Sequence, residues 1–366
     1  MDLYRFFQVQ GIHVLILRKM RILADIGHPK NAHIMGKLAP VLQARGHDVH
    51  FCYRERERIG ELCRALGLRG ESRGRGGEGR LGKLAYLIKA DLHLFRLARS
   101  LKPDLLLSFG SPYLAHVAGM CRIPMVVFDD TEENPIVQRI YLRSASAVAV
   151  PECFRKEFAF PMQRFAGYYE LAYLHPRRFL PDASIRSGLG LGPADRLILL
   201  RIVAWRALHD LGHDGIGAAG LNRVVEELSK KARVVISAED HLPSELEPLR
   251  LAVPPEKIHH VMAAASLVFS EGATMAAEGA VLGVPTVHVS DLRPGYLSDL
   301  EGRYGLLQSY PRCDLRGALE TAGSFLSAGN EIRNEWQKRR ERMLAESADV
   351  IEFMVKTIEA FDQGGR

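Results

Sequence analysis

Apolar positions along the chain alternate between two spacings. From Arg21 onward, short continuous apolar runs, typical of buried strands, are followed by longer segments whose apolar residues recur every three or four positions, as in helices. The first such unit predicts a strand at 22–26, a helix at 34–44 and a second strand from residue 48. Strand, helix and strand in that order form a βαβ unit with parallel strands and a right-handed crossover. The pattern therefore predicts an α/β fold.

The same alternation divides the chain into two halves. A stretch rich in Pro, Tyr and Gly follows the first half, a new strand starts near residue 197, and a long charged helix pattern fills 331–361. At 366 residues the chain is also too long for one average domain. We therefore expect an extension that could be disordered, an N-terminal domain, a linker, a C-terminal domain and a C-terminal helix packing back on the N-terminal domain, over residues 1–19, 20–166, 167–192, 193–335 and 336–366.

The segment 267–289 carries the most specific local pattern. It reads as a short apolar strand, a turn of small residues, a helix and a second strand. The helix is expected to begin near Ala273 and to end at Gly283, where Gly-Val-Pro stops it and starts the next strand. An ordinary α/β unit with a packed helix would show the same spacing.

The start of this helix is a candidate phosphate site. Its first turn leaves the N–H groups of Gly272, Ala273 and Thr274 without internal partners at the positive end of the helix dipole. Glu271 and Glu278 are two turns apart and can share one face, where an acid could accept hydrogen bonds from ribose or sugar hydroxyls. This chemistry indicates a nucleotide-sugar site.

Composition and charge indicate which kinds of molecule the protein could bind. The net charge of +6 and the pI near 9.1 suit an anionic small substrate or an anionic membrane surface. Nucleic acid is not expected as a partner, because no zinc-finger, helix-turn-helix or RNA-reading motif is present. The five cysteines are scattered and never form a C-x-x-C pair, which indicates reduced thiols and a cytoplasmic location.

A basic segment and the helix after it offer a possible acceptor surface. The run 69–80 is so rich in Gly and Arg that we expect a mobile basic loop. The helix over 81–97 carries an apolar stripe of Leu81, Leu84, Ile88, Leu92 and Phe95. The stripe could face the core, leaving a solvated basic face, or it could face a membrane or lipid.

The first half offers a histidine and a group of acids. His33 lies near the start of the first helix, where it could deprotonate an acceptor hydroxyl near neutral pH, and His28 could contact substrate. Both histidines could instead only cap and order the turn. The acids of 129–133 follow another strand and could be a solvated turn. Otherwise Asp130 or Glu132 is the acid expected to orient His33 or the acceptor.

The second half offers further groups at strand ends, where open α/β sheets bind ligands. After its first strand come Arg201, Trp205, His209 and Asp210, positions at which a diphosphate would meet a cation. After its next strand, Ser237 and Glu239 could border the same site.

The sequence of 209–214, His-Asp-Leu-Gly-His-Asp, also has the histidine spacing of a divalent-metal site. Glycines at 212 and 215 weaken a helix there, and no third histidine motif accompanies it. We therefore expect no metal.

Several motifs together resemble a known family. The stretches 25–29 (DIGHP), 45–49 (RGHDV), 102–104 (KPD), 128–132 (FDDTE), 167–174 (GYYELAYL) and 201–210 (RIVAWRALHD) are similar to domain-of-unknown-function family 354. The likeness runs from about Met20 to the C-terminal helix. More distantly, the chain resembles GT-B glycosyltransferases and UDP-N-acetylglucosamine 2-epimerase.

That likeness implies two Rossmann-like domains facing each other across a cleft, with the donor nucleotide held mainly by the C-terminal domain. In the epimerase, an Asp-Ser-Gly-Gly turn seats the diphosphate and a Glu on the next helix holds the ribose; the matching positions here are 271–274 and Glu278. The second Gly is replaced by Thr274, and 290–296 replaces the epimerase's basic, acidic and proline stretch. His33 resembles the base of some inverting GT-B enzymes.

These implications define the expected function. We expect a metal-independent transferase that needs no cofactor besides a nucleoside-diphosphate sugar, serving surface polysaccharide or glycolipid synthesis. Its acceptor could be lipid-linked, which would place the protein on the inner face of the membrane. The alternatives are a non-hydrolysing 2-epimerase acting on a nucleoside-diphosphate sugar and a non-catalytic nucleotide-sugar-binding protein.

Overall fold

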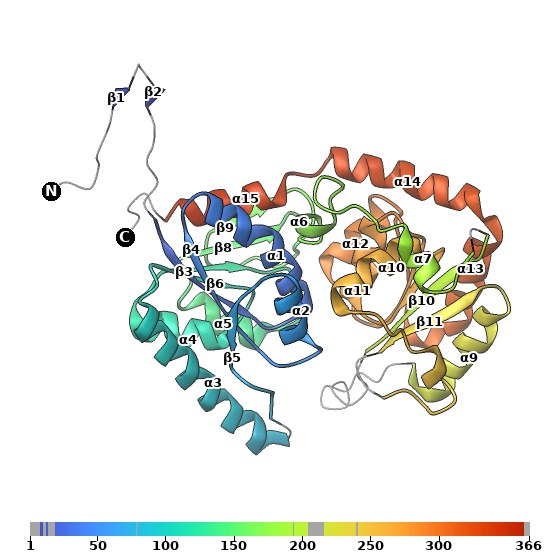
Figure 1. Cartoon of the computed structure of the whole chain (residues 1–366), viewed down its shortest axis with the longest axis horizontal. Helices are drawn as coiled ribbons and strands as arrows, with labels where there is room; N and C mark the ends of the chain where they lie inside the picture. The colour runs from blue at the N-terminus through green and yellow to red at the C-terminus, as the bar shows by residue number, and fades with distance from the viewer. Residues whose placement is uncertain are drawn as a thin grey trace.

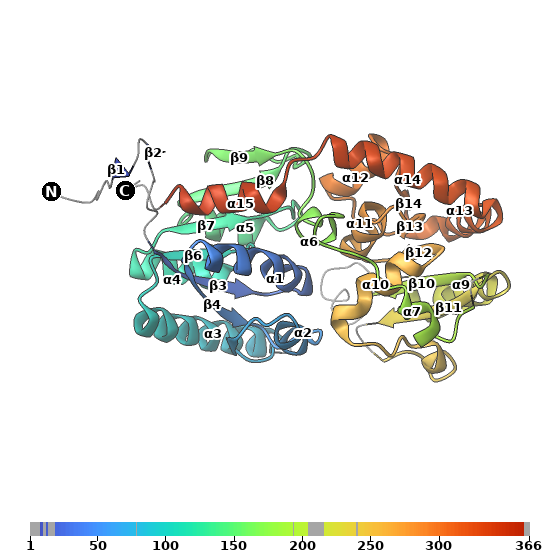
Figure 2. The same ribbon diagram turned by 45° about the horizontal axis from the view of Figure 1, so that its top comes forward.

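Two parallel β-sheets with flanking helices lie side by side in the computed structural model (Figures 1 and 2). The structure describes residues 8–9, 12–13, 19–77, 79–192, 194–203, 216–238 and 241–361. A short antiparallel pair, β1 (Gln8–Val9) and β2 (Ile12–His13), precedes the first sheet. The expected α/β architecture with two Rossmann-like domains is confirmed.

The N-terminal sheet has seven parallel strands in the order β5-β4-β3-β6-β7-β8-β9. The strands are β3 (Arg21–Ile26), β4 (Asp48–Tyr53), β5 (Gly70–Ser72), β6 (Leu105–Ser108), β7 (Met125–Phe128), β8 (Ala147–Pro151) and β9 (Met162–Phe165). The helices between them are α1 (Pro29–Ala44), α2 (Ile59–Ala65), α3 (Gly79–Leu101), α4 (Pro112–Cys121) and α5 (Pro135–Leu142). The strand order reverses between β3 and β6, which is where open α/β sheets bind ligands.

The C-terminal sheet has five parallel strands in the order β11-β10-β12-β13-β14, and its order reverses between β10 and β12. The strands are β10 (Leu197–Ile202), β11 (Arg233–Ala238), β12 (Leu267–Ser270), β13 (Thr286–Val289) and β14 (Gln308–Tyr310). The helices and 3-10 turns around them are α9 (Gly217–Ser229), η1 (Glu247–Leu249), η2 (Pro255–Lys257), α10 (Ile258–Ala264), α11 (Ala273–Val281), α12 (Gly295–Gly302), η3 (Arg312–Asp314) and α13 (Leu315–Ala328).

The Gly- and Arg-rich run 69–80 is not a loop throughout: residues 70–72 form an edge strand and α3 begins at Gly79, whereas 73–77 form no helix or strand. β5 pairs with β4 in parallel register. Arg73 directly after it is only 3% exposed, and its Nε donates to a carboxylate oxygen of Asp25 at 2.9 Å. Removing either partner of this buried ion pair would leave the other charge unpaired, which is strongly destabilising.

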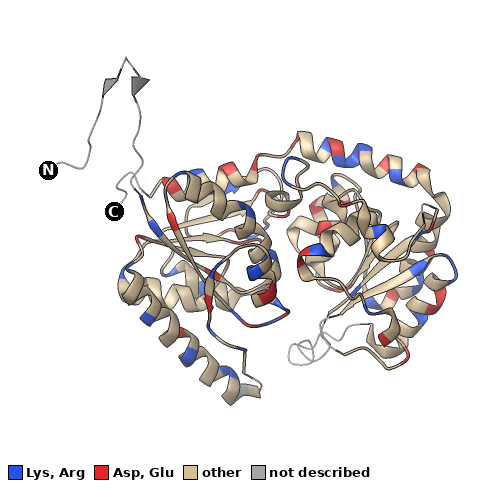
Figure 3. Cartoon of the chain, in the orientation of Figure 1, with Lys and Arg blue, Asp and Glu red and all other residues tan. Residues whose placement is uncertain are grey.

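The apolar stripe of α3 faces outward, so the first of its two alternatives, burial in the core, is wrong for most of its members. The stripe residues are exposed to 83% at Leu81, 56% at Leu84, 52% at Ile88 and 48% at Leu92. The opposite face of α3 is buried and packs on α4. Its buried residues are Tyr86, Ala90, Leu94 and Ala98. In Figure 3, α3 lies at the outer edge of the N-terminal domain and carries several basic side chains.

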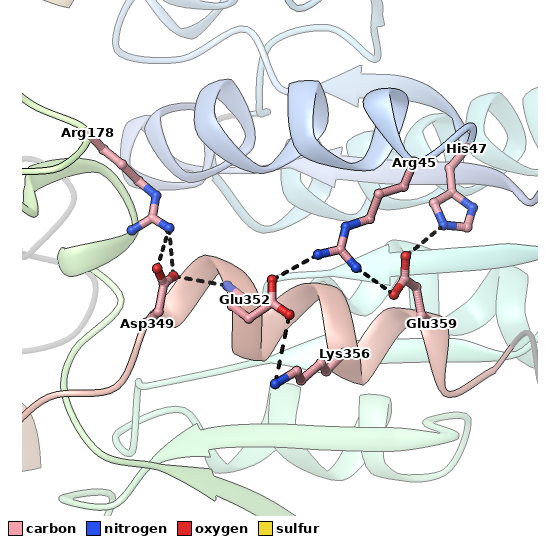
Figure 4. Close-up of polar contacts among 7 residues, drawn as sticks. All are labelled: Arg45, His47, Arg178, Asp349, Glu352, Lys356 and Glu359. Atoms are coloured by element: carbon pink, nitrogen blue, oxygen red, sulfur yellow. Dashed lines mark hydrogen bonds and ion pairs between the residues drawn. The ribbon is translucent and has the colours of Figure 1, made fainter. Parts of the chain in front are cut away.

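Helices at the end of the chain join the two domains. The charged pattern of 331–361 forms two helices, α14 (Asn330–Ala345) and α15 (Val350–Glu359), with Asp349 capping the second. Arg178 donates to both carboxylate oxygens of Asp349 at 2.6 and 2.7 Å. Further along α15, Arg45 at the end of α1 binds Glu352 and Glu359, so α15 is fixed against the N-terminal domain (Figure 4).

One apolar cluster runs through both domains. It includes residues of α1 and α15 on the N-terminal side and of α10, α11 and α12 on the other. The short helix α6 (Leu171–Leu174) of the linker is fully buried between them and contacts α1, α11 and α15. The linker also holds α7 (Ser184–Gly188), which packs on α10. The domains are therefore joined by a packed core as well as by the chain.

Arg73→Met should lower the free energy of unfolding by about 3–5 kcal/mol, because it leaves the buried carboxylate of Asp25 without its cation. Arg69→Met, at an exposed position in the same run, should change it by less than about 0.5 kcal/mol. Urea denaturation followed by circular dichroism measures both. Equal small effects for the two variants would contradict the structural role of Arg73.

Candidate functional site

Helix α11 starts where the strand order of the C-terminal sheet reverses. Its N-cap residue Gly272 has extended backbone angles, and no side chain caps the helix. The N–H of Gly272 itself donates to Ser270 Oγ at 3.1 Å, so the candidate phosphate seat consists of the N–H groups that follow it. Ala273, Thr274 and Met275 are half-buried, and the residues after them are buried.

Arg201 and Ser237 lie next to this helix start. A Cβ at Gly272 would come within 3.8 Å of Arg201 Cγ and 3.2 Å of Val203 Cγ1, so the arginine stem runs beside the first turn. Arg201 Nη1 donates to Ser237 Oγ at 3.2 Å. The structure thus brings together one cation, one hydroxyl and a helix N-terminus that the sequence places far apart.

Glu271 holds the backbone around the site. Its carboxylate accepts from the N–H of Val203 at 3.3 Å and from that of Ile216 at 2.6 Å, and the residue is 6% exposed. Both carboxylate oxygens of Glu271 therefore bind backbone N–H groups, and its role as an acceptor for sugar hydroxyls stays a prediction.

Glu278 lies in a buried cluster between the domains. Its Oε1 accepts from the Tyr173 hydroxyl at 2.7 Å and lies 3.0 Å from His259 Nε2. The ring of His33 stacks on Tyr173 with centroids 5.4 Å apart and meets His259 edge-on at 4.4 Å. Glu278 is 3% exposed and His33 8%. The two predicted site residues are therefore neighbours, but both are closed off in this conformation.

Burial and charge set the protonation states in this cluster. Burial alone would raise the pKa of Glu278, but the charge of His259 and its contact bring that pKa down to about 2. Burial, followed by the effect of His259, holds the pKa of His33 well below its usual value. At neutral pH the cluster therefore contains a carboxylate and a neutral His33 imidazole, which is the form that can accept a proton.

A second buried cluster surrounds Lys30 in the first turn of α1. Its ammonium binds the carboxylates of Asp130 and Glu170, the latter at 2.7 Å, and lies 5.2 Å from the centroid of the Tyr296 ring. Burial would lower the pKa of Lys30, but the two carboxylates raise it well above its usual value, so it remains charged. Glu170 belongs to the linker and Tyr296 to α12, so this lysine connects both domains.

Neither candidate acid orients His33. Asp130 pairs with Lys30, whose full charge makes it the stronger partner in a buried site. Glu132 accepts from the N–H groups of Gly295 and Arg155, both at 2.6 Å, and so caps α12 from the opposite domain. In this conformation neither acid orients His33, and the alternative, that one of them orients the acceptor, stays a prediction.

Of the remaining candidates, one caps a helix and the others lie outside the described residues. His28 caps α1, and its Nδ1 accepts from the N–H of Lys30 at 3.2 Å. Trp205, His209, Asp210 and Glu239 lie outside the described residues, as does the possible metal motif at 209–214. Among the residues that the structure describes, no group of His, Cys, Asp and Glu could hold a metal ion.

Sequence reasoning missed Lys30, Glu170, Tyr173, His259 and Tyr296. One signal was available for Lys30, because a lysine in the first turn of a helix opposes the helix dipole and calls for a nearby acid. Glu170 and Tyr173 were visible only as parts of the quoted 167–174 motif. Their partners come from the other domain, and no local pattern indicates them.

Comparison with known proteins identifies the family. A family model described as "Protein of unknown function (DUF354)" matches residues 20–298, well over half of the chain. The chain belongs to this family. An uncharacterized protein of Methanocaldococcus jannaschii is 24% identical to it over 276 residues, which are 72% of this chain and 80% of that protein.

Solved structures match this DUF354 chain across nearly its whole length. A structure described as a candidate UDP-N-acetylglucosamine 2-epimerase from Listeria monocytogenes has a TM-score of 0.69 at 13% identity, covering 96% of this chain and 98% of its own. The UDP-GlcNAc 2-epimerase from Neisseria meningitidis bound to UDP-GlcNAc has a TM-score of 0.62 at 13% sequence identity, covering 93% of this chain and 99% of that structure. A spinosyn rhamnosyltransferase complexed with thymidine diphosphate has a TM-score of 0.58 at 15% sequence identity, covering 93% of this chain and 100% of that structure. The DUF354 chain therefore has the GT-B fold.

The buried neutral His33 should make the protein less stable in mild acid. Below its ordinary pKa of about 6.5 the unfolded chain takes up a proton that the folded chain does not, so the free energy of unfolding falls by about 1.4 kcal/mol per pH unit. Burial also lowers the pKa of His288, to about 4, so His288 adds a slope of the same sign over this range in the parent and in the variant. In His33→Phe the slope should therefore be smaller by about 1.4 kcal/mol per pH unit between about pH 6.5 and pH 5. Glu278 also contributes to the free energy of unfolding, but its contribution is lost only as the pH falls from its unfolded pKa near 4.5 to its folded pKa of about 2. That range lies below the window used for His33.

Urea denaturation at a series of pH values measures the slope. His241→Gln, at an exposed histidine, should retain the wild-type slope. An unchanged slope in His33→Phe would mean that His33 takes up a proton in the folded protein.

Proposed function

We propose that this protein binds a nucleoside-diphosphate sugar at the start of α11 and transfers its glycosyl group to an acceptor. The observation that carries the proposal is the uncapped first turn of α11 beside Arg201, at the point where the strand order of the C-terminal sheet reverses. Ligands of open α/β sheets bind at such points, outside the carboxyl ends of the strands.

The chemistry of this position suits a diphosphate. The N–H groups of the first turn lie at the positive end of the helix dipole, where an anion is stabilised. Arg201 would add a full positive charge beside them and would neutralise the diphosphate as it leaves. Thr274 would contribute its backbone N–H, and its side chain would limit how closely the phosphates approach.

His33 is the proposed base and Glu278 the proposed ribose ligand. His33 is neutral at neutral pH and lies on the N-terminal domain, the side from which an acceptor would approach. In this conformation both side chains are closed off by Tyr173 on α6. A ribose hydroxyl would therefore have to replace the Tyr173 hydroxyl on Glu278, so donor binding would open the contact between the domains.

The fold comparisons support the proposal in general terms. Structures with this fold are described in complex with UDP-GlcNAc and with thymidine diphosphate. An epimerase is the second candidate, because the 2-epimerase structures match with higher TM-scores than the rhamnosyltransferase complex. Transfer is preferred because the acids that the N-terminal domain offers, Asp130 and Glu132, are already bound to Lys30 and to the α12 backbone.

Thr274→Asp should weaken donor binding by at least about tenfold, because its carboxylate would repel the diphosphate. The same carboxylate interacts favourably with the positive end of the helix dipole, so the fold should keep its stability. Thr274→Asn is the matched neutral control and should bind almost as the parent does. A thermal-shift panel of UDP-, GDP-, dTDP- and CMP-sugars, followed by calorimetry on the best member, measures the effect. No shift with any donor would refute the donor site.

His33→Phe should slow donor turnover by about 100-fold or more while leaving donor affinity unchanged, because it removes only the proposed base. Release of free nucleoside diphosphate is the readout. Incubation with UDP-GlcNAc, followed by nuclear magnetic resonance for UDP-ManNAc, tests the epimerase. Donor binding with no turnover in either assay, and no effect of His33→Phe, would support a non-catalytic binding protein instead.

A further inference from the structure

Helix α3 exposes a continuous apolar stripe along its outer face. Leu81, Leu84, Ile88 and Leu92 follow the spacing of one helix face. Of the seven large apolar side chains that are exposed in the described residues, these are four. A soluble surface tolerates single exposed apolar residues, whereas a contiguous row of them marks an interaction site.

The charged residues of α3 beside this stripe are almost all basic. Lys83, Lys89, Arg96 and Arg99 are exposed. Asp91 is the acid of this helix; it is half-buried and bound to His116 Nδ1 at 2.8 Å. In Figure 3, α3 shows several bands coloured as Lys or Arg along the outer edge of the N-terminal domain. An apolar stripe flanked by lysine and arginine is the pattern of a helix that lies in a membrane interface.

We propose that α3 docks the protein on an anionic lipid bilayer, with the apolar stripe among the lipid chains and the basic side chains at the headgroups. This inference does not depend on the proposed function. Within the part of the chain that the structure describes, no helix is long and apolar enough to cross a bilayer. The contact would therefore be a peripheral one.

The charges favour lipid over a second copy of the chain. If two copies packed stripe to stripe, the basic residues of both α3 helices would be brought close together, and like charges in an interface repel. Lysine is also depleted in protein–protein interfaces. An anionic surface instead attracts each of these cations, and their long side chains can reach the headgroups while their stems lie along the apolar layer.

The test uses the full chain with vesicles of phosphatidylcholine alone and of phosphatidylcholine mixed with phosphatidylglycerol. The protein should co-sediment with the mixed vesicles only, and binding should fall as salt is added. Leu84→Ser combined with Ile88→Ser should lower the partition coefficient by about tenfold or more, because burial of apolar area drives insertion. Ile136→Ser combined with Leu180→Ser is the matched control, since both residues are exposed but lie on other elements.

Charge reversal tests the electrostatic part. Lys89→Glu combined with Arg96→Glu should abolish binding to the mixed vesicles. Arg139→Glu combined with Arg143→Glu, which changes the net charge equally at exposed positions of α5 and its end, should lower binding only slightly. Thermal unfolding at the parent's temperature shows that each variant is folded and that any loss of binding is confined to the lipid contact.

Two results would overturn the proposal. The first is wild-type protein that stays in solution with both kinds of vesicle, or that binds equally well after the stripe substitutions. The second is a concentration-dependent dimer, seen by light scattering without lipid, that Leu84→Ser with Ile88→Ser converts to a monomer. That second result would assign the stripe to a second copy of the chain.

Discussion

The Lys30 ammonium, buried between Asp130 and Glu170 and beside the Tyr296 ring, ties the first turn of α1 to a strand end of its own domain, to the linker and to the opposite domain. A charge in this position persists only while its partners are present, because an unpaired buried ion costs several kcal/mol. These contacts and the apolar core around α6 together hold the relative placement of the two domains. Both His33, one turn further along α1, and the contact between Tyr173 and Glu278 follow from that placement.

The polar groups at the strand ends of the N-terminal domain have partners within the protein, whereas the start of α11 in the C-terminal domain has no side-chain cap. On the N-terminal side, Asp130 binds the ammonium of Lys30, and His28 accepts from the Lys30 N–H. Glu132 accepts from the N–H of Gly295 in the opposite domain. On the C-terminal side, the first turn of α11 has no side-chain cap and stays half-buried. A ligand at α11 would compete with the interdomain contacts around Glu278, so binding and domain opening would be coupled.

Much of the fold could be predicted from periodicity, because buried parallel strands and packed helices each have a local apolar pattern. The βαβ unit of 22–52 and the α11 unit are examples. Prediction failed where distant partners decide the outcome. Within the run 69–80, residues 70–72 pair with β4, and Arg73 directly after them binds Asp25. The site was predicted as separate residues; their mutual contacts, such as Glu132 with Gly295, could not be read from spacing.

The sequence by itself determined the α/β class, the two halves and the helix start at Ala273, because each depends on residues close together in the chain. It also determined that α3 would be amphipathic, but not which face would be covered. The tertiary structure decided that the α3 stripe is exposed, that Asp130 binds Lys30, and that Glu278 meets Tyr173 and His259. These outcomes depend on the partner that packing brings to each side chain, and a local pattern carries no information about that partner.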